Sequence, residues 1–256
     1  MPVLSDLSDL VVVLVRPRNP LNIGAAARAM TNFGARRLRL VNPYKLAFRD
    51  ARSAVGAASL LKKAEEFPTL AEAVADCVLV IGTTAIRHRT LPHPARRLDE
   101  PTGALIRSSL VRSTLVGSGP KANRVAILFG SEKTGLSNDD FSHCHWLLNI
   151  PTHDENISMN LGQAVAVCLY ELSRTTPAEL ASEKAAPATA DANEQITDGW
   201  LEALRISGYV KPGTDAMFEK KARQLILRFG LEAYDAKLLL GMVRQILWKL
   251  RQTSKA

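Results

Sequence analysis

The chain has 256 residues, enough for one sizeable α/β domain and a smaller appendage. Its hydrophobic fraction of 46% is ordinary for a globular protein, and no apolar run approaches the roughly 20 residues that a membrane span needs. The first ten residues carry Asp6 and Asp9 and no basic cluster, so we expect neither a secretory signal nor a membrane segment. Three cysteines in apolar surroundings, Cys77, Cys144 and Cys168, are typical of reduced thiols in a cytoplasmic protein.

The formal net charge of +8 is unevenly distributed and favours a polyanionic partner. Nine Lys or Arg residues fall between Arg16 and Arg52 against the single acid Asp50, and a second basic run covers Arg87 to Arg97. A solvated surface is the usual fate of charged side chains, but two lopsided runs in one chain favour a phosphate-binding face. The candidate phosphate contacts from these runs are Arg16, Arg18, Arg36, Arg87 and Arg89.

Apolar runs alternate with helical patterns over the first two thirds of the chain, which predicts a parallel sheet covered on both faces. The expected strands are Val11 to Val15, Arg37 to Val41, Val78 to Ile81, Val125 to Phe129 and Trp146 to Ile150. Helices are expected after Asn22, over Arg49 to Ala58, after Thr69, over Leu105 to Val116, after Ser137 and after Asn160. The proline-rich stretch from Leu91 to Pro101 is expected to be an exposed connection.

Helix-capping residues and small residues mark the junctions between these elements. Asn22 is expected to cap the first helix, and Gly24 to Ala27 give that helix a face with almost no side chain, suited to close packing on a backbone or a ligand. Thr69 with Glu72, and Ser137 three residues before Asp140, are typical of helix N-termini.

Three strand-to-helix junctions offer room for a ligand. From Leu147 to Gln163 a strand gives way to a polar loop and a helix, with Ser158 and Asn160 near the helix start. Such a junction presents backbone N–H groups to small polar ligands, although capping alone is the commoner role of Ser and Asn. Small residues also follow two other strands, at Gly82 to Ala85 and Gly130 to Gly135. None of these loops matches a P-loop or a dinucleotide fingerprint.

Metal and hydrolase chemistry are not supported by the motifs. His143-Cys144-His145 with His153 resembles a ligand set, but on a strand Cys144 would face away from both neighbouring histidines, and the spacing matches no structural zinc pattern. We therefore expect no metal site. A serine hydrolase is equally unsupported, because no Gly-x-Ser-x-Gly elbow is present.

The last third of the chain predicts a linker and a small helical domain. Composition shifts to Ala, Thr, Pro, Glu and Lys between Thr175 and Asn193 without an apolar period. Beyond it, Glu194 to Ser207, Asp215 to Phe229 and Leu231 to Arg251 are expected to be amphipathic helices. The predicted organisation is a domain over residues 1–175, a linker over 176–193 and a helical domain over 194–256.

Three segments, in their order and spacing, resemble the motifs of the SpoU/TrmH-type RNA 2′-O-ribose methyltransferases of the SPOUT superfamily. They are Asn22 to Arg28, Phe129 to Leu136, and Ile150-Pro151 with Ser158 to Leu161. The match extends from Val11 to Leu172, and the helical tail resembles that of the TrmJ-like group. Met159 stands where the family more often has Leu, which bears on substrate preference.

The resemblance implies a fold and an activity that composition does not show. The fold is a Rossmann-like parallel sheet whose C-terminal part is threaded into a deep trefoil knot, followed by the helical domain. The activity is S-adenosyl-L-methionine-dependent methylation of tRNA by a cytoplasmic homodimer, with cytidine or uridine 32 of the anticodon loop as target. Motif by motif, the implied cofactor pocket is Thr83, Thr84, Ala85, Gly130, Ile150, Ile157, Ser158 and Met159, and the implied catalytic neighbourhood is Asn22, Arg28, Glu132, Ser158 and Asn160.

The roles of these residues follow in part from their chemistry. A guanidinium pKa of about 12.5–13.8 makes Arg28 a poor general base, so we expect it to act as a fixed positive charge. The proton acceptor stays open. The basic residues of the helical tail are expected to add RNA affinity, while the cofactor site lies in the first domain. These candidates are Arg223, Arg228, Lys237, Arg244 and Lys249, although solvated helix faces are their default role.

Alternative activities are a SpoU-type methylation of another tRNA position or of rRNA, a non-catalytic RNA-binding module of the same fold, and an unrelated nucleotide-binding α/β protein. The joint presence of Asn22, Arg28, Ser158 and Asn160 argues against a non-catalytic module. The nucleotide-binding alternative needs a phosphate loop that the sequence does not contain.

Overall fold

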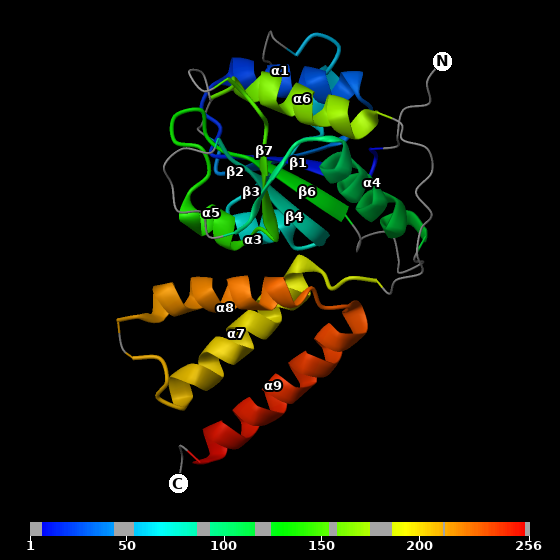
Figure 1. The fold of residues 1–256 in the computed structure, drawn as a ribbon. Coiled ribbons are helices and arrows are strands. Elements are labelled where there is room, and N and C mark those ends of the chain that lie inside the picture. The colour runs from blue at the N-terminus through cyan, green and yellow to red at the C-terminus, as the bar shows by residue number, and fades with distance from the viewer. Residues whose placement is uncertain are drawn as a thin grey trace.

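A parallel sheet lies at the centre of the computed structural model, which describes residues 7–43, 54–85, 93–115, 124–153, 158–174, 186–211 and 213–253. Seven strands are hydrogen-bonded in the order β3-β2-β1-β6-β4-β7-β5, and each neighbouring pair is parallel (Figure 1). The strands are β1 (Leu10–Val15), β2 (Arg37–Val41), β3 (Glu65–Phe67), β4 (Cys77–Thr83), β5 (Ala95–Arg97), β6 (Arg124–Phe129) and β7 (Trp146–Asn149). The predicted parallel sheet is confirmed.

The two strands that the sequence did not reveal, β3 and β5, lie at the edges of the sheet. Each has only three residues, too few to show an apolar period. The prediction of an exposed connection was therefore wrong at Ala95–Arg97. Backbone hydrogen bonds hold both ends of this segment to β7. Leu147 N donates to Pro94 O at 3.1 Å, and Leu98 N donates to Asn149 O at 2.7 Å.

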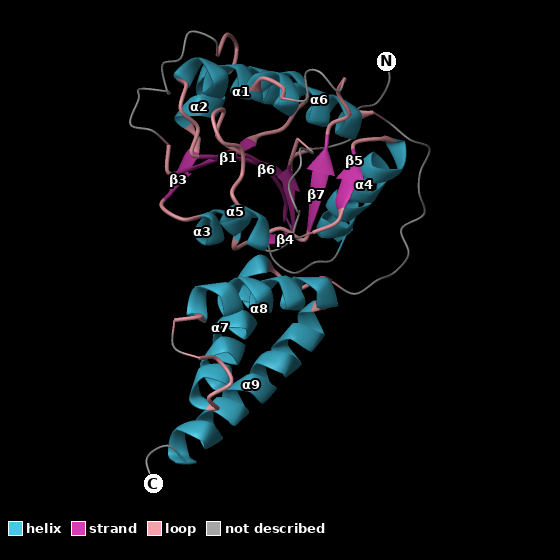
Figure 2. Ribbon diagram, turned by 60° about the vertical axis from the view of Figure 1, so that its left-hand side comes forward, coloured by secondary structure: helices cyan, strands magenta, loops and turns pink. Residues whose placement is uncertain are grey.

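Helices cover both faces of the sheet (Figures 1 and 2). Alternate β1 side chains supply two cores: Leu10, Val12 and Leu14 face one, and Val11, Val13 and Val15 face the other. Helices α1, α2, α4 and α6 cover the first core, and α3 and α5 the second. The helices are α1 (Pro20–Asn32), α2 (Ala58–Lys62), α3 (Leu70–Val74), α4 (Glu100–Leu115), α5 (Asn138–Ser142), α6 (Leu161–Ser173), α7 (Ala190–Ile206), α8 (Asp215–Phe229) and α9 (Ala233–Thr253).

Helix starts agree with the predicted caps at three of four positions. Thr69 caps α3, Asn160 caps α6, and Ser137 forms a capping box with Asp140 at the start of α5. The prediction that Asn22 caps α1 was wrong, because Asn19 takes that role: its side chain accepts a hydrogen bond from Leu21 N at 2.9 Å. Since α1 begins at Pro20, Asn22 already lies within its first turn, and its amide is available for other contacts.

Two predicted boundaries are also wrong. The expected helix over 49–58 is not formed in its described part, where residues 54–57 make a turn with Gly56 at a φ of 76° and α2 begins only at Ala58. The expected linker over 176–193 ends early, because the Thr189 side chain caps α7 by accepting from Ala192 N at 3.1 Å. Residues 175–185 lie outside the described part of the chain.

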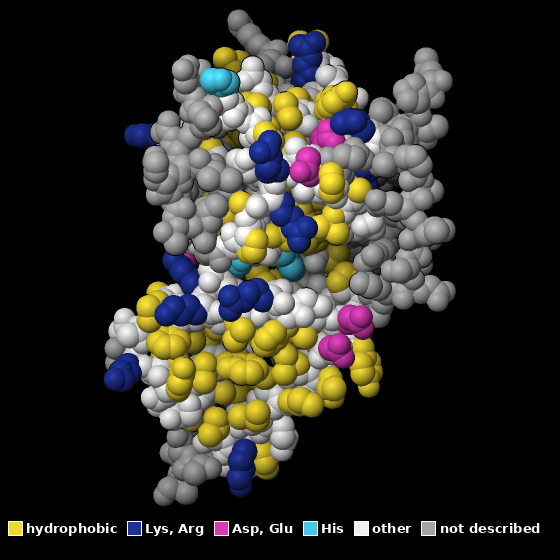
Figure 3. All heavy atoms as spheres, in the orientation of Figure 1, with side chains coloured by type: hydrophobic (Ala, Val, Ile, Leu, Met, Phe, Trp, Pro, Cys, Tyr) yellow, Lys and Arg dark blue, Asp and Glu magenta, His cyan; other side chains and the backbone are white. Residues whose placement is uncertain are grey.

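Two of the C-terminal helices, α7 and α8, dock on the face of the sheet that α3 and α5 cover, and α9 packs on α7 (Figures 1 and 2). Ala190 joins the second core, and Asp191 N donates to Ala75 O at 3.0 Å. The outer face of the tail is not only basic: Figure 3 shows hydrophobic side chains gathered over it. The exposed ones on α8 and α9 are Met217, Leu225, Phe229, Tyr234, Leu238, Met242, Ile246 and Trp248.

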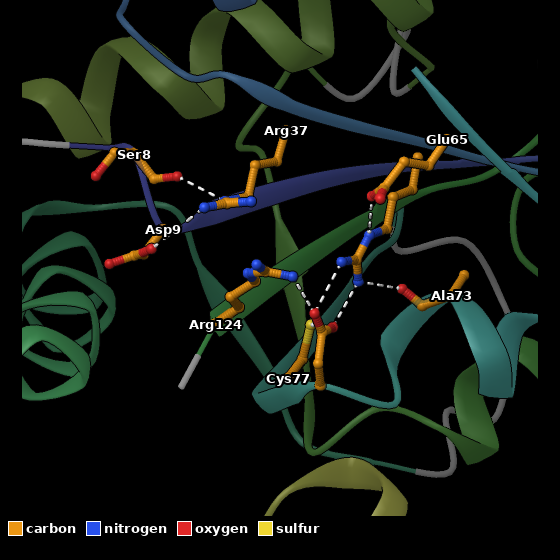
Figure 4. Close-up of polar contacts among 9 residues, drawn as sticks. Ser8, Asp9, Arg37, Glu65, Ala73, Cys77 and Arg124 are labelled. Atoms are coloured by element: carbon orange, nitrogen blue, oxygen red, sulfur yellow. Dashed lines mark hydrogen bonds and ion pairs between the residues drawn. The ribbon is translucent and has the colours of Figure 1, made fainter. Parts of the chain in front are cut away.

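A polar network occupies the ends of β4 and β6 where these strands begin (Figure 4). Arg39 is 3% exposed and donates to Asp76 Oδ1 at 2.6 Å and to Glu65 Oε2 at 3.0 Å. Arg124 also pairs with Asp76. Burial alone would raise the pKa of Asp76, but the contacts with Arg39 and Arg124 outweigh it and lower that pKa. Arg39, which belongs to the first basic run, is therefore used inside the protein.

Within the described residues, none of the helices has the length and hydropathy that a bilayer span requires.

Candidate active site

A cavity of about 560 Å³ opens where β4, β6 and β7 end. Three loops line it: Thr83–Ala85 after β4, Gly130–Leu136 after β6, and the segment with Ile150 and Thr152 after β7. The start of α6 closes the remaining side with Asn160 and Leu161. The carboxyl edge of a parallel sheet is the usual ligand site of α/β proteins, and cavities of about 300–1,000 Å³ hold small organic ligands.

The loop after β6 depends on two glycines. A Cβ atom on Gly130 would lie 2.1 Å from the carbonyl carbon of Gly135, so no side chain fits there. Gly135 has a φ of 66°, in the left-handed region that favours glycine, and its N–H donates to Ser131 O at 2.7 Å. The segment between these glycines is therefore a tight turn, and it brings Glu132 to the rim of the cavity.

Asn22, Glu132 and Asn160 form a chain of hydrogen bonds at this rim. Asn22 Nδ2 donates to Glu132 Oε1 at 3.0 Å, and Asn160 Nδ2 donates to Asn22 Oδ1 at 3.0 Å. Asn160 Oδ1 in turn accepts from Gly162 N at 2.9 Å as the cap of α6. A carboxylate only accepts, so each amide in the chain has one possible orientation. One loop and two helix starts are joined through these three side chains.

The Glu132 carboxylate is already occupied by donors. Besides Asn22, it accepts from Arg18 N at 3.0 Å and from Asn19 N at 3.1 Å. Partial burial alone would raise the pKa of Glu132, but these hydrogen bonds outweigh it and hold the pKa below its ordinary value of 4.5. A carboxylate with a lowered pKa is a weak general base, whereas its three hydrogen bonds make Glu132 an organising contact at the rim of the cavity.

A second set of hydrogen bonds joins the chain after β1 to the loop after β6. Asp140 is 3% exposed and accepts from Ser137 N at 2.6 Å and from Arg16 Nη1 at 3.1 Å, while Arg16 Nη2 bonds its other oxygen. Arg16 has a φ of 51°, unusual for a residue with a side chain, which turns the chain sharply after β1. Arg16 was a predicted phosphate contact, and the structure pairs its guanidinium with Asp140 while 42% of the Arg16 side chain stays exposed.

Most of the predicted site residues meet at this cavity. Those that line it are Asn22, Thr83, Thr84, Ala85, Gly130, Glu132, Ile150, Ser158, Met159 and Asn160. Ile157 lies outside the described residues. Arg28 is not among the lining residues: it is exposed on α1, and no hydrogen bond or ion pair joins it to the described part of the chain.

The predicted phosphate contacts have different surroundings. Arg18 and Arg36 are exposed, as expected. Arg87 and Arg89 lie outside the described residues. In the second basic run, Arg96 stacks its guanidinium over the Trp146 ring at 5.2 Å. Of the tail residues considered for RNA contact, Arg223 is 6% exposed and therefore not available for one.

Sequence reasoning missed several lining residues, above all Lys133, Phe141, Leu148 and Thr152. Lys133 stands between the two loop glycines, so its position in the motif was a usable signal. Phe141 lies six residues after Gly135, and only the short helix α5 brings its ring to the cavity wall. No sequence pattern indicated that the chain would bring Phe141 back to the cavity.

The cysteines and histidines have separate structural roles. The three thiols are free and buried, and burial raises the pKa of Cys168 to about 12. His145 Nδ1 accepts from Val80 N at 3.1 Å, and burial lowers its pKa to about 4. His143 Nδ1 lies 3.5 Å from Glu194 Oε1. Across the described ranges, no three His, Cys, Asp or Glu side chains are grouped as metal ligands.

Comparison with known proteins decides the family. Residues 9–170 match the model of the SpoU rRNA Methylase family. The chain belongs to the SpoU methylase family. The expectation of an RNA methyltransferase is thereby confirmed, and the matched range contains all three motifs and the whole cavity lining.

Relatives of this SpoU protein match it beyond the methylase domain. A tRNA (cytidine/uridine-2′-O-)-methyltransferase TrmJ from Klebsiella pneumoniae is 34% identical over 94% of this chain and 97% of its own length. The corresponding protein from Yersinia pestis is 33% identical over 94% of this chain and 92% of its own. The crystal structure of TrmJ from Z. mobilis ZM4 has a TM-score of 0.74 at 32% identity and covers 92% of this chain and 98% of that one. The match therefore includes the C-terminal helices.

Proposed function

We propose that this SpoU protein transfers the methyl group of S-adenosylmethionine to a ribose 2′-hydroxyl of tRNA, at cytidine or uridine 32 of the anticodon loop. One observation carries the proposal: the motif residues Asn22, Glu132 and Asn160 converge on one cavity in a chain that resembles named tRNA methyltransferases over nearly its whole length. The tRNA partner is also consistent with the exposed cation Arg18, which follows β1 at this edge of the sheet.

The cavity suits S-adenosylmethionine in size and lining. Its walls combine the apolar side chains of Leu136, Phe141 and Ile150 with backbone groups of three glycine- or threonine-containing loops. Such a mixture fits a molecule with an aromatic base and several polar groups. Bound in it, the cofactor would supply a methyl group activated on a sulfonium. The residues proposed to hold it are Thr83, Thr84, Ala85, Gly130, Ile150, Ile157, Ser158 and Met159.

The residues of the chain contribute positioning and electrostatics. Asn160 and Asn22 are fixed by the bonds to Glu132 and to the start of α6, so their polar atoms keep one orientation at the cavity rim. Ser158 lines the cavity two residues before Asn160 and offers a hydroxyl to the substrate ribose. A fixed guanidinium stabilises the charge that develops on the ribose oxygen, and Arg28 has that role in the proposal.

The exposed position of Arg28, outside the cavity of its own chain, supports a homodimer in this proposal. It lies on the outer side of α1 in line with Leu21, seven residues earlier, and α6 beside it exposes Val167 and Tyr170 (Figure 1). We propose that this face of α1 and α6 forms an isologous dimer interface, which brings Arg28 to the partner's site. Light scattering on the wild type should give twice the chain mass, and Tyr170→Asp should give the monomer.

The order of the strands supports the proposed trefoil knot. Strand β6 lies between β1 and β4, and β7 between β4 and β5, so late segments are inserted between earlier ones. An experimental structure that traces residues 116–123, 154–157 and 175–185 would test the threading. For a tRNA-modifying enzyme the proposed location is the cytoplasm.

The decisive experiment incubates the protein with methyl-labelled S-adenosylmethionine and tRNA and then maps the labelled ribose. Label at ribose 32 that disappears from a transcript with 2′-deoxyribose at that position supports the proposal. Label at another tRNA position or in rRNA would keep the reaction and replace the substrate. Tight tRNA binding without label would leave a non-catalytic RNA-binding module.

A further inference from the structure

The short helix α5 connects two parts of the molecule. On one side it belongs to the cavity: Phe141 lines the wall, and Asp140 holds both Ser137 and Arg16. On its other side α5 contacts the C-terminal helices through Asp139, Ser142 and His143. A helix of five residues is too short to be stable by itself, so its place depends on these contacts.

Arg223 of α8 is the centre of the contacts from the tail. Its Nη1 donates to Ser142 Oγ at 3.1 Å. Its Nε donates to both carboxylate oxygens of Glu194, at 2.7 and 3.0 Å, and its Nη2 to Glu219 Oε1 at 2.8 Å. At 6% exposure this guanidinium is out of reach of RNA. A planar guanidinium with a bond at each of its three nitrogens holds its partners in one geometry.

The partners of Arg223 also contact α5 directly. Glu194 Oε1 lies 3.5 Å from His143 Nδ1, and Lys220 Nζ, one turn before Arg223, lies 3.2 Å from Asp139 Oδ1. Burial alone would raise the pKa of Glu194, but the bonds from His143 and Arg223 outweigh it and lower that pKa, so Glu194 stays charged. The contacts of Asp139, Ser142 and His143 therefore fix the outer side of α5 to α7 and α8.

We propose that Arg223 is a positioning residue for the cofactor cavity: through Ser142 it fixes α5, and α5 fixes the loop Gly130 to Ser137. The C-terminal helices are then a structural part of the cofactor site and not only an appendage for RNA. The proposal rests on the proposed function, because it concerns S-adenosylmethionine in this cavity. It differs from the sequence-based expectation that the cofactor site depends on the first domain alone.

The test measures S-adenosylmethionine affinity by calorimetry on the full-length protein. Ser142→Ala removes the acceptor on α5 and leaves Arg223 with both of its glutamates, so the tail stays folded. Arg223→Lys keeps the charge and removes the planar fork. Each should bind about twofold to thirtyfold more weakly, the range expected for coupling through a packed network. The matched control is Arg205→Gln, which breaks an exposed ion pair of the tail with Asp215 that does not contact α5.

A second measurement separates positioning from general stability. Hydrogen exchange at the Gly135 amide, which bonds Ser131 O across the loop, should accelerate in both variants at temperatures where circular dichroism shows them folded. Ser142→Ala combined with Asp140→Asn should lose less affinity than the two single losses predict together, because both changes release the same helix.

The outcomes are distinct. Wild-type affinity in Ser142→Ala and Arg223→Lys, or strict additivity with Asp140→Asn, overturns the positioning role and leaves the proposed function intact. A wild-type protein that binds no S-adenosylmethionine overturns the proposed function, and the positioning role with it. Equal weakening in Arg205→Gln would show a general effect of the tail and also overturn the role of Arg223.

Discussion

Replacing Glu132 by Gln exchanges one carboxylate oxygen at the rim of the cavity for an NH₂ group. The carboxylate accepts from three donors: Arg18 N, Asn19 N and the Asn22 amide. A glutamine side chain has the same shape as the glutamate but a single acceptor oxygen. Its NH₂ group must face at least one of these donors, whichever way the amide is turned. The substitution therefore removes at least one hydrogen bond and takes the charge from the others.

The expected magnitudes follow from these bonds. A hydrogen bond to a charged group contributes about 1.5–3 kcal/mol, and partial solvent exposure of Glu132 reduces this, so we expect a stability loss of about 1 kcal/mol. Turnover should suffer more. Asn22 keeps at most a neutral acceptor in place of the carboxylate that orients its amide, and a misplacement of about 1 Å at a reacting centre costs about a hundredfold in rate. We expect turnover to fall by about that factor.

The assay is methyl transfer to tRNA at saturating S-adenosylmethionine, with thermal unfolding measured in parallel between pH 3 and pH 8. The folded pKa of Glu132 is below its ordinary value, so its contribution is complete above about pH 4.5 and is lost as pH falls through the lower, folded-state pKa. The stability difference between wild type and Glu132→Gln should therefore be constant near neutrality and shrink in acid.

Glu65→Gln is the matched control, because it removes a carboxylate bonded to Arg39 at β3, on the edge of the sheet away from the cavity. It should leave turnover unchanged. Near-normal turnover in Glu132→Gln would refute the organising role. A turnover that falls with a pKa near neutrality, and that is abolished in Glu132→Gln, would instead make Glu132 the general base.

Three further predictions follow from the structure. Arg28→Lys keeps the charge without the planar fork and should still reduce turnover by orders of magnitude, with an unchanged melting temperature. The control Arg36→Ala should only weaken tRNA binding, in a salt-dependent way. Near-normal turnover in Arg28→Lys would make Arg28 one more phosphate contact. Gly130→Ala should abolish cofactor binding, because the new Cβ overlaps the backbone of the loop, while Gly241→Ala, in open space on α9, should be neutral or stabilising; measurable cofactor binding by Gly130→Ala would contradict the closed loop. The native protein should not react with a thiol reagent at pH 8 until it is unfolded, because all three cysteines are buried; rapid labelling of the folded chain would show that one of them is accessible.

Elements with a strong local pattern were predictable. Four apolar runs and the alternating segment Arg37–Val41 became strands within one or two residues, since a buried parallel strand favours a continuous apolar sequence. The cap at Ser137 and the bounds of α8 followed from local hydrogen bonding and from Gly230, which has a φ of 58°. The edge strands β3 and β5 were not predictable, because the backbone of a neighbouring strand holds them and their side chains carry no period.

The family was indicated by the sequence alone, because the residues within each of its three motifs are adjacent or closely spaced along the chain. Which cations are available for a partner was decided only by tertiary structure. Arg39 and Arg223 read as surface charges, yet each is buried against a carboxylate from a distant segment of the sequence, Asp76 and Glu194. A basic run cannot show such pairs, because an ion pair depends on distance in space, and the fold sets that distance. The same is true of α5, whose five residues carry no sign that they join the C-terminal helices to the cavity.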